Sequence, residues 1–118
     1  MGEEYILNAY VPVRPIPAPR TTTKSWWTRA KSFMQFRDDC RLWLPRLDVP
    51  VSGPCAVEIE LHEANPRADV DNVAKAILDT LVGPILRDDC LSVVNQLMIY
   101  MSPVERDGFT VRIWENPQ

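Results

Sequence analysis

Residues 68–83 read ADVDNVAKAILDTLVG, and the rest of the chain is best interpreted outward from this stretch. From Val70 to Val82 its apolar residues recur at i, i+3, i+4, i+7, i+8, i+11 and i+12, which is the spacing of one helical face. Gly83 and Pro84 follow directly and end the pattern. The stretch therefore predicts an amphipathic helix whose apolar face packs on a core.

The polar side of this predicted helix is rich in acids. Asp69 and Asp71 lie at its start, where one carboxylate is enough to cap the free backbone N–H groups. Asp71, Lys75 and Asp79 are spaced i, i+4, i+8 and therefore share one face. A further pair of aspartates, at 88–89, follows the Gly-Pro break and precedes an apolar run. Capping alone does not require so many acids.

A divalent cation is the physical reason for such acids to gather. Mg²⁺ prefers oxygen ligands and retains several waters, and it can activate a water against a phosphodiester. We expect the acids on either side of the helix to meet closely enough to hold one ion, with Lys75 contacting a phosphate. The alternative is a set of caps and surface ion pairs, each worth only about 0.3–0.5 kcal/mol. The spacing alone leaves both interpretations open.

The flanking segments predict a four-stranded mixed sheet packed by two main helices. The predicted strands are Tyr5–Val13, Cys55–His62, Val93–Met101 and Phe109–Glu115, and a second helix is predicted from Trp26 to Leu44 with Ser25 as its N-cap. Asp107-Gly108 is typical of a hairpin between the last two strands. The order β-α-β-α-β-β indicates a single α+β domain over residues 1–118. Which strands pair is left open.

Composition excludes several classes of protein. In 118 residues, 46% hydrophobic and 25% charged residues are typical of a folded globular domain rather than a disordered or fibrous chain. No apolar run approaches the roughly 18 residues of a membrane span, and the acidic N-terminus predicts a cytoplasmic protein without a secretory signal. Cys40, Cys55 and Cys90 are widely spaced and are expected to be buried thiols rather than zinc ligands. With His62 as the only histidine, Ser/His or Cys/His catalysis is not expected.

The net charge of −3 hides a strong asymmetry. The segment from Arg14 to Arg46 carries +6, and the remainder carries −9. The segment begins with a Pro/Arg-rich stretch at about residues 12–25, where four prolines by position 19 predict an extended, exposed chain. It is interpreted either as an arm that binds a polyanion or as a solvated helix face balanced by acidic neighbours.

The acidic motif is similar to that of a known family. DVDNVAKAILDTLVG followed by RDD resembles the signature of the RusA family of Holliday-junction resolvases, which has the form DxDNxxKxxxDxLxG, a short gap and then DD. The resemblance extends along most of the chain. It implies an endodeoxyribonuclease of phage or prophage type that acts as a homodimer on four-way DNA junctions in recombination and repair. It also implies Mg²⁺ as the cofactor, with Mn²⁺ as a substitute, no small-molecule cofactor, no membrane, and a cytoplasmic, nucleoid-associated location.

The resemblance also assigns roles to residues by position. The metal-binding and catalytic aspartates it implies are Asp69, Asp71 and Asp89, with Lys75 as the catalytic lysine. Asp88 matches the less critical first acid of its pair, and Asn72 and Asp79 match positions that support the site. The DNA-binding residues it implies are Arg14, Arg20, Lys24, Arg29 and Lys31.

This sequence departs from the family pattern in two places. Family members often have a glutamine shortly after the DD pair and a lysine in the next strand, where this chain has Leu91-Ser92 and Tyr100. A basic contact from that strand is therefore in doubt. Two alternatives to a nuclease stay open: a RusA-like junction-binding protein without catalysis, and a plain interaction domain whose acids are caps and ion pairs.

Overall fold

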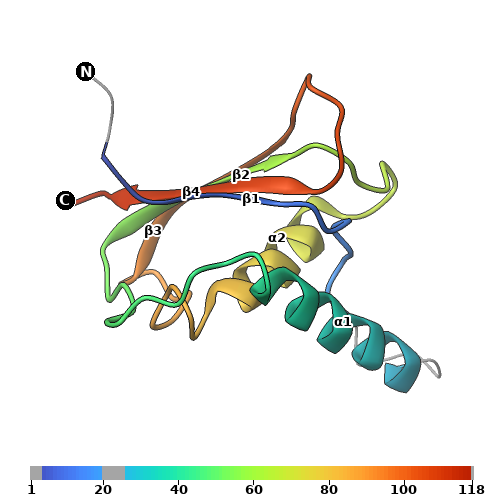
Figure 1. Cartoon of the computed structure of the whole chain (residues 1–118), viewed down its shortest axis with the longest axis horizontal. Coiled ribbons are helices and arrows are strands. Elements are labelled where there is room, and N and C mark those ends of the chain that lie inside the picture. Colours follow the sequence, from blue (N-terminus) through green and yellow to red (C-terminus); the bar gives the residue numbers. More distant parts are fainter. Residues whose placement is uncertain (1–3, 20–25, 118) are drawn as a thin grey trace.

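The computed structural model describes residues 4–19 and 26–117, which form one mixed sheet with two helices against one of its faces (Figure 1). The elements are β1 (Tyr5–Val11), α1 (Trp26–Arg41), β2 (Cys55–Leu61), α2 (Val70–Leu81), β3 (Val94–Met101) and β4 (Phe109–Glu115). The predicted order and the α+β class are confirmed, and the predicted ends differ by at most three residues. The N-cap predicted at Ser25 lies outside the described residues.

The strands lie in the order β1-β4-β2-β3. β4 is antiparallel to both β1 and β2, whereas β2 and β3 are parallel and are connected through α2, because parallel neighbours need a crossover. The predicted hairpin between the last two strands is therefore wrong. Gly108, at φ +80°, instead carries the chain past Val11, whose backbone a side chain at this position would strike.

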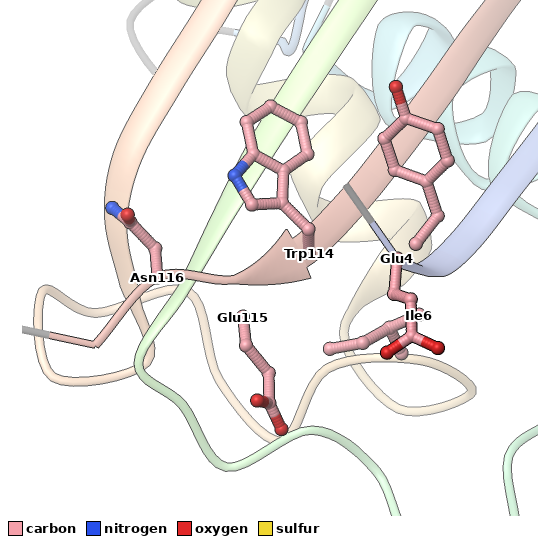
Figure 2. A pocket seen from close by; sticks show the side chains of 6 residues that line it. Glu4, Ile6, Trp114, Glu115 and Asn116 are labelled. Carbon is pink, nitrogen blue, oxygen red and sulfur yellow. The ribbon is translucent and has the colours of Figure 1, made fainter. Parts of the chain in front are cut away.

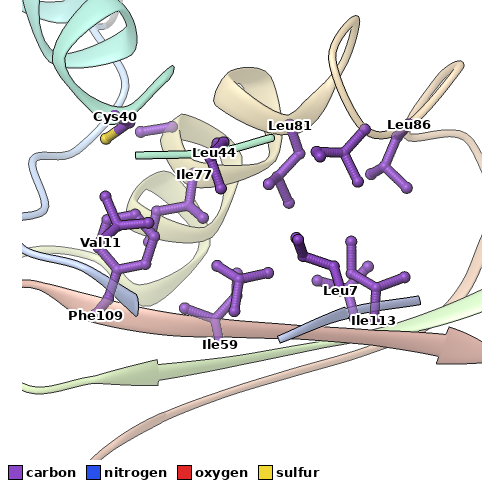
Figure 3. Close-up of a cluster of buried hydrophobic side chains, with 14 of the residues drawn as sticks. Leu7, Val11, Cys40, Leu44, Ile59, Ile77, Leu81, Leu86, Phe109 and Ile113 are labelled. Atoms are coloured by element: carbon purple, nitrogen blue, oxygen red, sulfur yellow. The ribbon is translucent and has the colours of Figure 1, made fainter. Parts of the chain in front are cut away.

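The hydrophobic core fills the layer between the sheet and the helices, as Figure 3 shows. Along β2 the predicted alternation is confirmed: Val57 and Ile59 are fully buried, and Glu58 and Glu60 lie on the opposite, uncovered face. The apolar face of α2 is buried through Ile77 and Leu81, in agreement with its periodicity.

Two side chains that the sequence predicts to be buried are exposed instead. Helical spacing continued through the predicted range Trp26–Leu44 places Trp43 on the core face, but Trp43 follows the end of α1 and is 55% exposed. Phe36, which the pattern did not select, is buried in its place and packs against Phe109. Cys40 and Cys55 are buried thiols as predicted, whereas Cys90 is exposed in the loop before β3.

The described part of the Pro/Arg-rich segment, residues 12–19, is extended but not wholly exposed. Arg14 and Pro17 are exposed, whereas Pro15 is buried and Ile16 packs against the core. The backbone N–H of Ala18 donates a hydrogen bond of 3.0 Å to the carbonyl oxygen of Asn72 in α2. The segment is therefore anchored to the start of the acidic helix.

Candidate active site

The first acidic group lies at the start of α2. Asp69 is the N-cap by its backbone (φ −70°, ψ 131°), and its carbonyl accepts the first helical hydrogen bond, 3.1 Å from the N–H of Val73. Its carboxylate makes no capping hydrogen bond. Asp71, in the first turn, is exposed. The Asp71 carboxylate accepts a hydrogen bond of 3.0 Å from the backbone N–H of Asn72 in this turn, so capping accounts for one of the two acids and does not require the other.

The polar face of α2 has the arrangement that the spacing predicts. The Nζ of Lys75 lies 3.6 Å from Oδ1 of Asp79 one turn later, and the two side chains are 64% and 32% exposed. An exposed i, i+4 pair of this kind adds little to stability. Lys75 thus remains accessible to a phosphate that approaches the start of the helix.

The second acidic group lies beyond the opposite end of α2. The chain turns directly after the helix, where the N–H of Leu86 bonds the carbonyl of Leu81, and Asp88 and Asp89 follow within three residues. The twelve residues of α2 span about 18 Å, whereas three residues of chain reach at most about 10 Å. In Figure 1 the loop after α2 indeed lies away from the loop before it. The rigid helix keeps the two acidic groups apart.

Mg²⁺ fits the acidic groups of a single chain only in part. Among residues 4–19 and 26–117, no group of three or more His, Cys, Asp or Glu side chains is placed to hold a metal ion. The expected convergence of Asp69 and Asp71 with Asp89 is therefore not present in a single chain. Mg²⁺ nevertheless often takes only one or two carboxylates and completes its shell with waters and substrate phosphates. The carboxylate pair at the start of α2 fits that mode, and the ligand assignments stay predictions.

Two of the predicted DNA-binding residues can be placed. Arg14 is 57% exposed and forms an ion pair of 3.2 Å with Glu63, just after β2, at the end of the sheet where α2 begins. Lys31 is exposed on α1. Arg20, Lys24 and the side chain of Arg29 lie outside the described residues. The anchored segment that carries Arg14 thus brings positive charge to the acidic end of α2.

Two surface pockets lie near the ends of the sheet. One, of about 510 Å³, is lined by Arg14, Glu63, Ser102 and Arg106, at the same end as the start of α2. The other, of about 630 Å³, lies at the start of β1 and the end of β4 and is lined by Glu4, Tyr5, Ile6, Trp114, Glu115 and Asn116 (Figure 2). The larger pocket contains no predicted site residue. The candidate chemistry is therefore at an exposed helix end rather than in a deep cavity, as suits a large substrate.

Sequence reasoning missed one arginine that shapes the site. Arg41 lies within the +6 segment that the sequence predicts to bind a polyanion or to form a solvated helix face, but its guanidinium turns inward to the C-terminal end of α2. It donates hydrogen bonds to the carbonyl oxygens of Thr80 (3.2 Å), Asp79 (3.4 Å) and Val82 (2.8 Å). A cation at this end also complements the helix dipole. Only the position of Arg41 at the end of its helix, with α2 as the neighbour, could have suggested this role.

The position expected to lack a basic contact in β3 is instead part of a polar network. The hydroxyl of Tyr100 donates a hydrogen bond of 2.6 Å to the carboxylate of Glu58 on the uncovered face of the sheet. This hydrogen bond is the main cause that raises the pKa of Tyr100 to about 12, with burial adding to it. Tyr100 therefore stays protonated and serves the sheet rather than the acidic helix.

The fold and the acids of α2 agree with a comparison against protein families. The model described as "Endodeoxyribonuclease RusA" matches residues 12–114, which is most of the chain and includes both acidic groups. That match defines the class of protein as a nuclease, a hydrolase of phosphodiester bonds in DNA. The chain belongs to the RusA family of endodeoxyribonucleases, which act on branched DNA junctions. No curated protein matches the chain. No helix in the described ranges is long and apolar enough to cross a membrane.

Proposed function

We propose that this chain is a Mg²⁺-dependent, structure-selective endodeoxyribonuclease that resolves Holliday junctions by paired symmetric nicks, as a homodimer in recombination and repair. The observation that supports this proposal most directly is the intact acidic motif. Its Asp69 and Asp71 stand at an accessible helix end, within a chain that belongs to the RusA family. Since Asp71 already accepts the backbone N–H of Asn72, capping of the first turn does not require a second acid beside it.

Each part of the candidate site has a role that its chemistry allows. Asp69 and Asp71, at the start of α2, would hold the ion. When bound, Mg²⁺ would supply a Lewis acid for the phosphodiester. Lys75, one turn further on, would offset negative charge on a phosphate oxygen. Arg14, beside the same end of the sheet, would position the DNA backbone.

The homodimer follows from symmetry and from the separation of the acids. A four-way junction has two-fold symmetry, and two opposed nicks require two equivalent sites in matching orientation, which a C2 dimer provides. Asp89 lies beyond the far end of α2 from Asp69 and Asp71 in its own chain. We therefore propose that Asp89 of one copy serves the site that the other copy's helix begins.

The test of the proposed function is cleavage of a synthetic four-way junction in Mg²⁺. Asp71→Asn and Asp89→Asn should each abolish symmetric nicking while junction binding survives, because amides are poor ligands for Mg²⁺ but do not repel DNA. Asp48→Asn is the matched control, since Asp48 is exposed and outside the motif. A wild-type cleavage rate in either motif variant would show that the metal assignment is wrong.

The shared site can be tested with mixed dimers. Differently tagged Asp71→Asn and Asp89→Asn chains are co-expressed, and the mixed dimer is purified through both tags. If the acids come from two chains, one of its two sites contains intact Asp71 and intact Asp89, and single-strand nicking returns. If both acids come from one chain, each site carries one substitution, and the mixed dimer stays as inactive as the parents.

The alternative of a junction-binding protein without catalysis is decided by the same substrate. It predicts tight binding of the four-way junction with no symmetric nicks in Mg²⁺ or Mn²⁺. The presence of Asp69, Asp71, Lys75 and Asp89 together favours the nuclease, since a binding protein would have no need for all four.

A further inference from the structure

The open edge of the sheet at β3 is unlike the edges that soluble proteins normally expose. β3 pairs with β2 only, so its outer side presents backbone N–H and C=O groups that no strand pairs in the described chain. Its sequence, VNQLMIYM, contains no charged residue and no proline over eight residues. Natural proteins usually protect such an edge with charges, proline or a covering segment, because an unprotected edge pairs with another strand.

The apolar face of the sheet also continues onto β3 without cover. In the parallel register Val57 lies beside Leu97 and Leu61 beside Met101, so these side chains share the core face. Val57 and Leu61 are 0% and 5% exposed, whereas Leu97 and Met101 are 41% and 56% exposed. The helix layer that buries β2 therefore does not extend over β3, and apolar side chains of the core face are exposed to solvent at this edge.

The opposite edge, β1, is better protected. Its pairing with β4 is irregular between Tyr5 and Leu7, and Pro12 follows its last residue directly. Bulges and prolines are among the devices that disfavour pairing at a sheet edge. Segment 12–19 then leaves the sheet and packs against α2. Of the two edges, β3 is the one prepared for a partner.

We infer that the edge of β3 is the surface on which two copies of this chain associate, by antiparallel pairing of β3 with β3 across a two-fold axis. A strand without charges can face its own copy with no like charges opposed. The pairing would use the open backbone groups. It would also bring Leu97 and Met101 of both copies together, so that these apolar side chains are buried at the contact. It rests on the proposed function only in needing a homodimer, and it names the surface involved.

This arrangement agrees with the separation of the acids. Antiparallel pairing places the start of one β3 beside the end of the other. The loop that carries Asp89 precedes β3, and the start of α2 follows the end of β2, which is level with the end of β3 because the two strands are parallel. Each acidic group has an exposed aliphatic neighbour: Leu91, beside Asp89, is 84% exposed, and Val70, at the start of α2, is 59% exposed. The same contact would therefore bring the two acidic groups toward each other across the dimer.

Disulfide trapping without DNA tests the surface. In a Cys90→Ser background, which removes the exposed thiol, single cysteines are placed at Leu97, Met98 and Ile99. Residues that face each other in antiparallel strands have Cα atoms about 4.5–5.5 Å apart, which suits a disulfide. Oxidation should give a nearly complete covalent dimer for at least one position. Asn8→Cys on β1 is the control and should stay monomeric on a non-reducing gel.

A charged substitution at the edge of β3 tests the same surface without covalent cross-linking. Leu97→Lys places like charges on both sides of the axis and should raise the dimer dissociation constant by more than about tenfold in sedimentation. Asn8→Lys on β1 should leave that constant unchanged. A dimer that is unaffected by Leu97→Lys, a wild-type monomer at micromolar concentration, or cross-linking only through β1 would each overturn the inference. A β3-linked dimer that cleaves no junction would uphold it and refute the proposed function instead.

Discussion

At the scale of single residues, the uncovered face of the sheet is held by one arginine between two carboxylates. Nη1 of Arg112 on β4 lies 3.0 Å from Glu60 and 3.7 Å from Glu58 on β2. Ser102 donates a further hydrogen bond of 2.6 Å to Glu60, and Tyr100 bonds Glu58. Three strands are thus joined by charge-assisted bonds on the face that lacks a hydrophobic cover.

This network makes stability depend on acid pH. The pKa of Glu60 is lowered, first by the hydrogen bond from Ser102 and then by Arg112, against the opposing effect of burial. Because the folded-state pKa lies below the ordinary value of 4.5, the stabilisation is present above pH 4.5 and is lost as the pH falls through the lowered pKa. Glu60→Gln should cost about 1 kcal/mol at pH 7 and should lose less stability than wild type on acidification. Urea unfolding at pH 7 and from pH 5 to pH 3 measures this, with exposed Glu105→Gln as the control.

The thiols give a second prediction at this scale. Burial, and then the charge of Asp39, raise the pKa of Cys40 to about 12, and burial raises the pKa of Cys55. Since the thiolate is the reactive form, a neutral disulfide reagent should label only Cys90 in the native protein and all three cysteines in urea. Labelling of Cys90→Ser should then be negligible until unfolding. Rapid native labelling of a second thiol would contradict the buried positions.

At the scale of elements, α1 and α2 are joined at one point by the clasp of Arg41 on three carbonyls. Arg41→Met keeps most of the length of the side chain but leaves the carbonyls of Thr80 and Val82 without this donor. Hydrogen bonds from a charged group contribute about 1.5–3 kcal/mol, so we expect a loss of about 2–3 kcal/mol in the free energy of unfolding. Arg46→Met, at an exposed position beyond α1, should cost less than about 0.5 kcal/mol. Equal losses in urea denaturation would show that the clasp contributes nothing specific.

The elements also show where sequence reasoning succeeds. The period of α2 predicted its bounds to within one residue and most of its buried face, because that face packs on the core from Val73 to Leu81, whereas Val70 is exposed. The alternation in β2 succeeded for the same reason. The strand order could not be predicted, since alternation shows which face of a strand is buried but not which strand it pairs with. The Asp-Gly turn indicated a hairpin that the sheet does not contain. Trp43 was misplaced because the helical period was continued past the residue where α1 ends.

The candidate site could be predicted as chemistry but not as geometry. The spacing placed Asp71, Lys75 and Asp79 on one face, and the ion pair between Lys75 and Asp79 agrees with it. The distance from Asp69 to Asp89 depends on a helix length and a turn, which a motif does not report. Arg41 was misjudged because whether a basic side chain faces solvent or a neighbouring helix is a tertiary property.

At the scale of the whole molecule, the segregation of charge predicts how DNA binding should depend on salt. With a net charge of −3, the chain is expected to bind DNA mainly through its +6 segment. Junction affinity should therefore fall steeply with salt, and each lost phosphate contact should reduce the slope of log K against log[salt] by about 0.9. Arg14→Gln and Lys31→Gln are expected to show this reduction in fluorescence anisotropy. Arg41→Met should not, because that side chain is turned inward. An unchanged slope in the first two would exclude them as contacts.

The hydrogen bond between Ala18 and Asn72 connects the proposed DNA-binding segment to the helix that carries Asp71 and Lys75. A flexible DNA-binding arm can move relative to the active site, and it then does not determine where along the strand cleavage occurs. The proposed DNA-binding segment of this chain is instead hydrogen-bonded to the first turn of α2, so a strand bound to it would lie at a fixed position relative to the carboxylates. The position of cleavage would then be set by the rigid connection between the two parts, so the nick is expected at a constant distance along the strand from the bound phosphates.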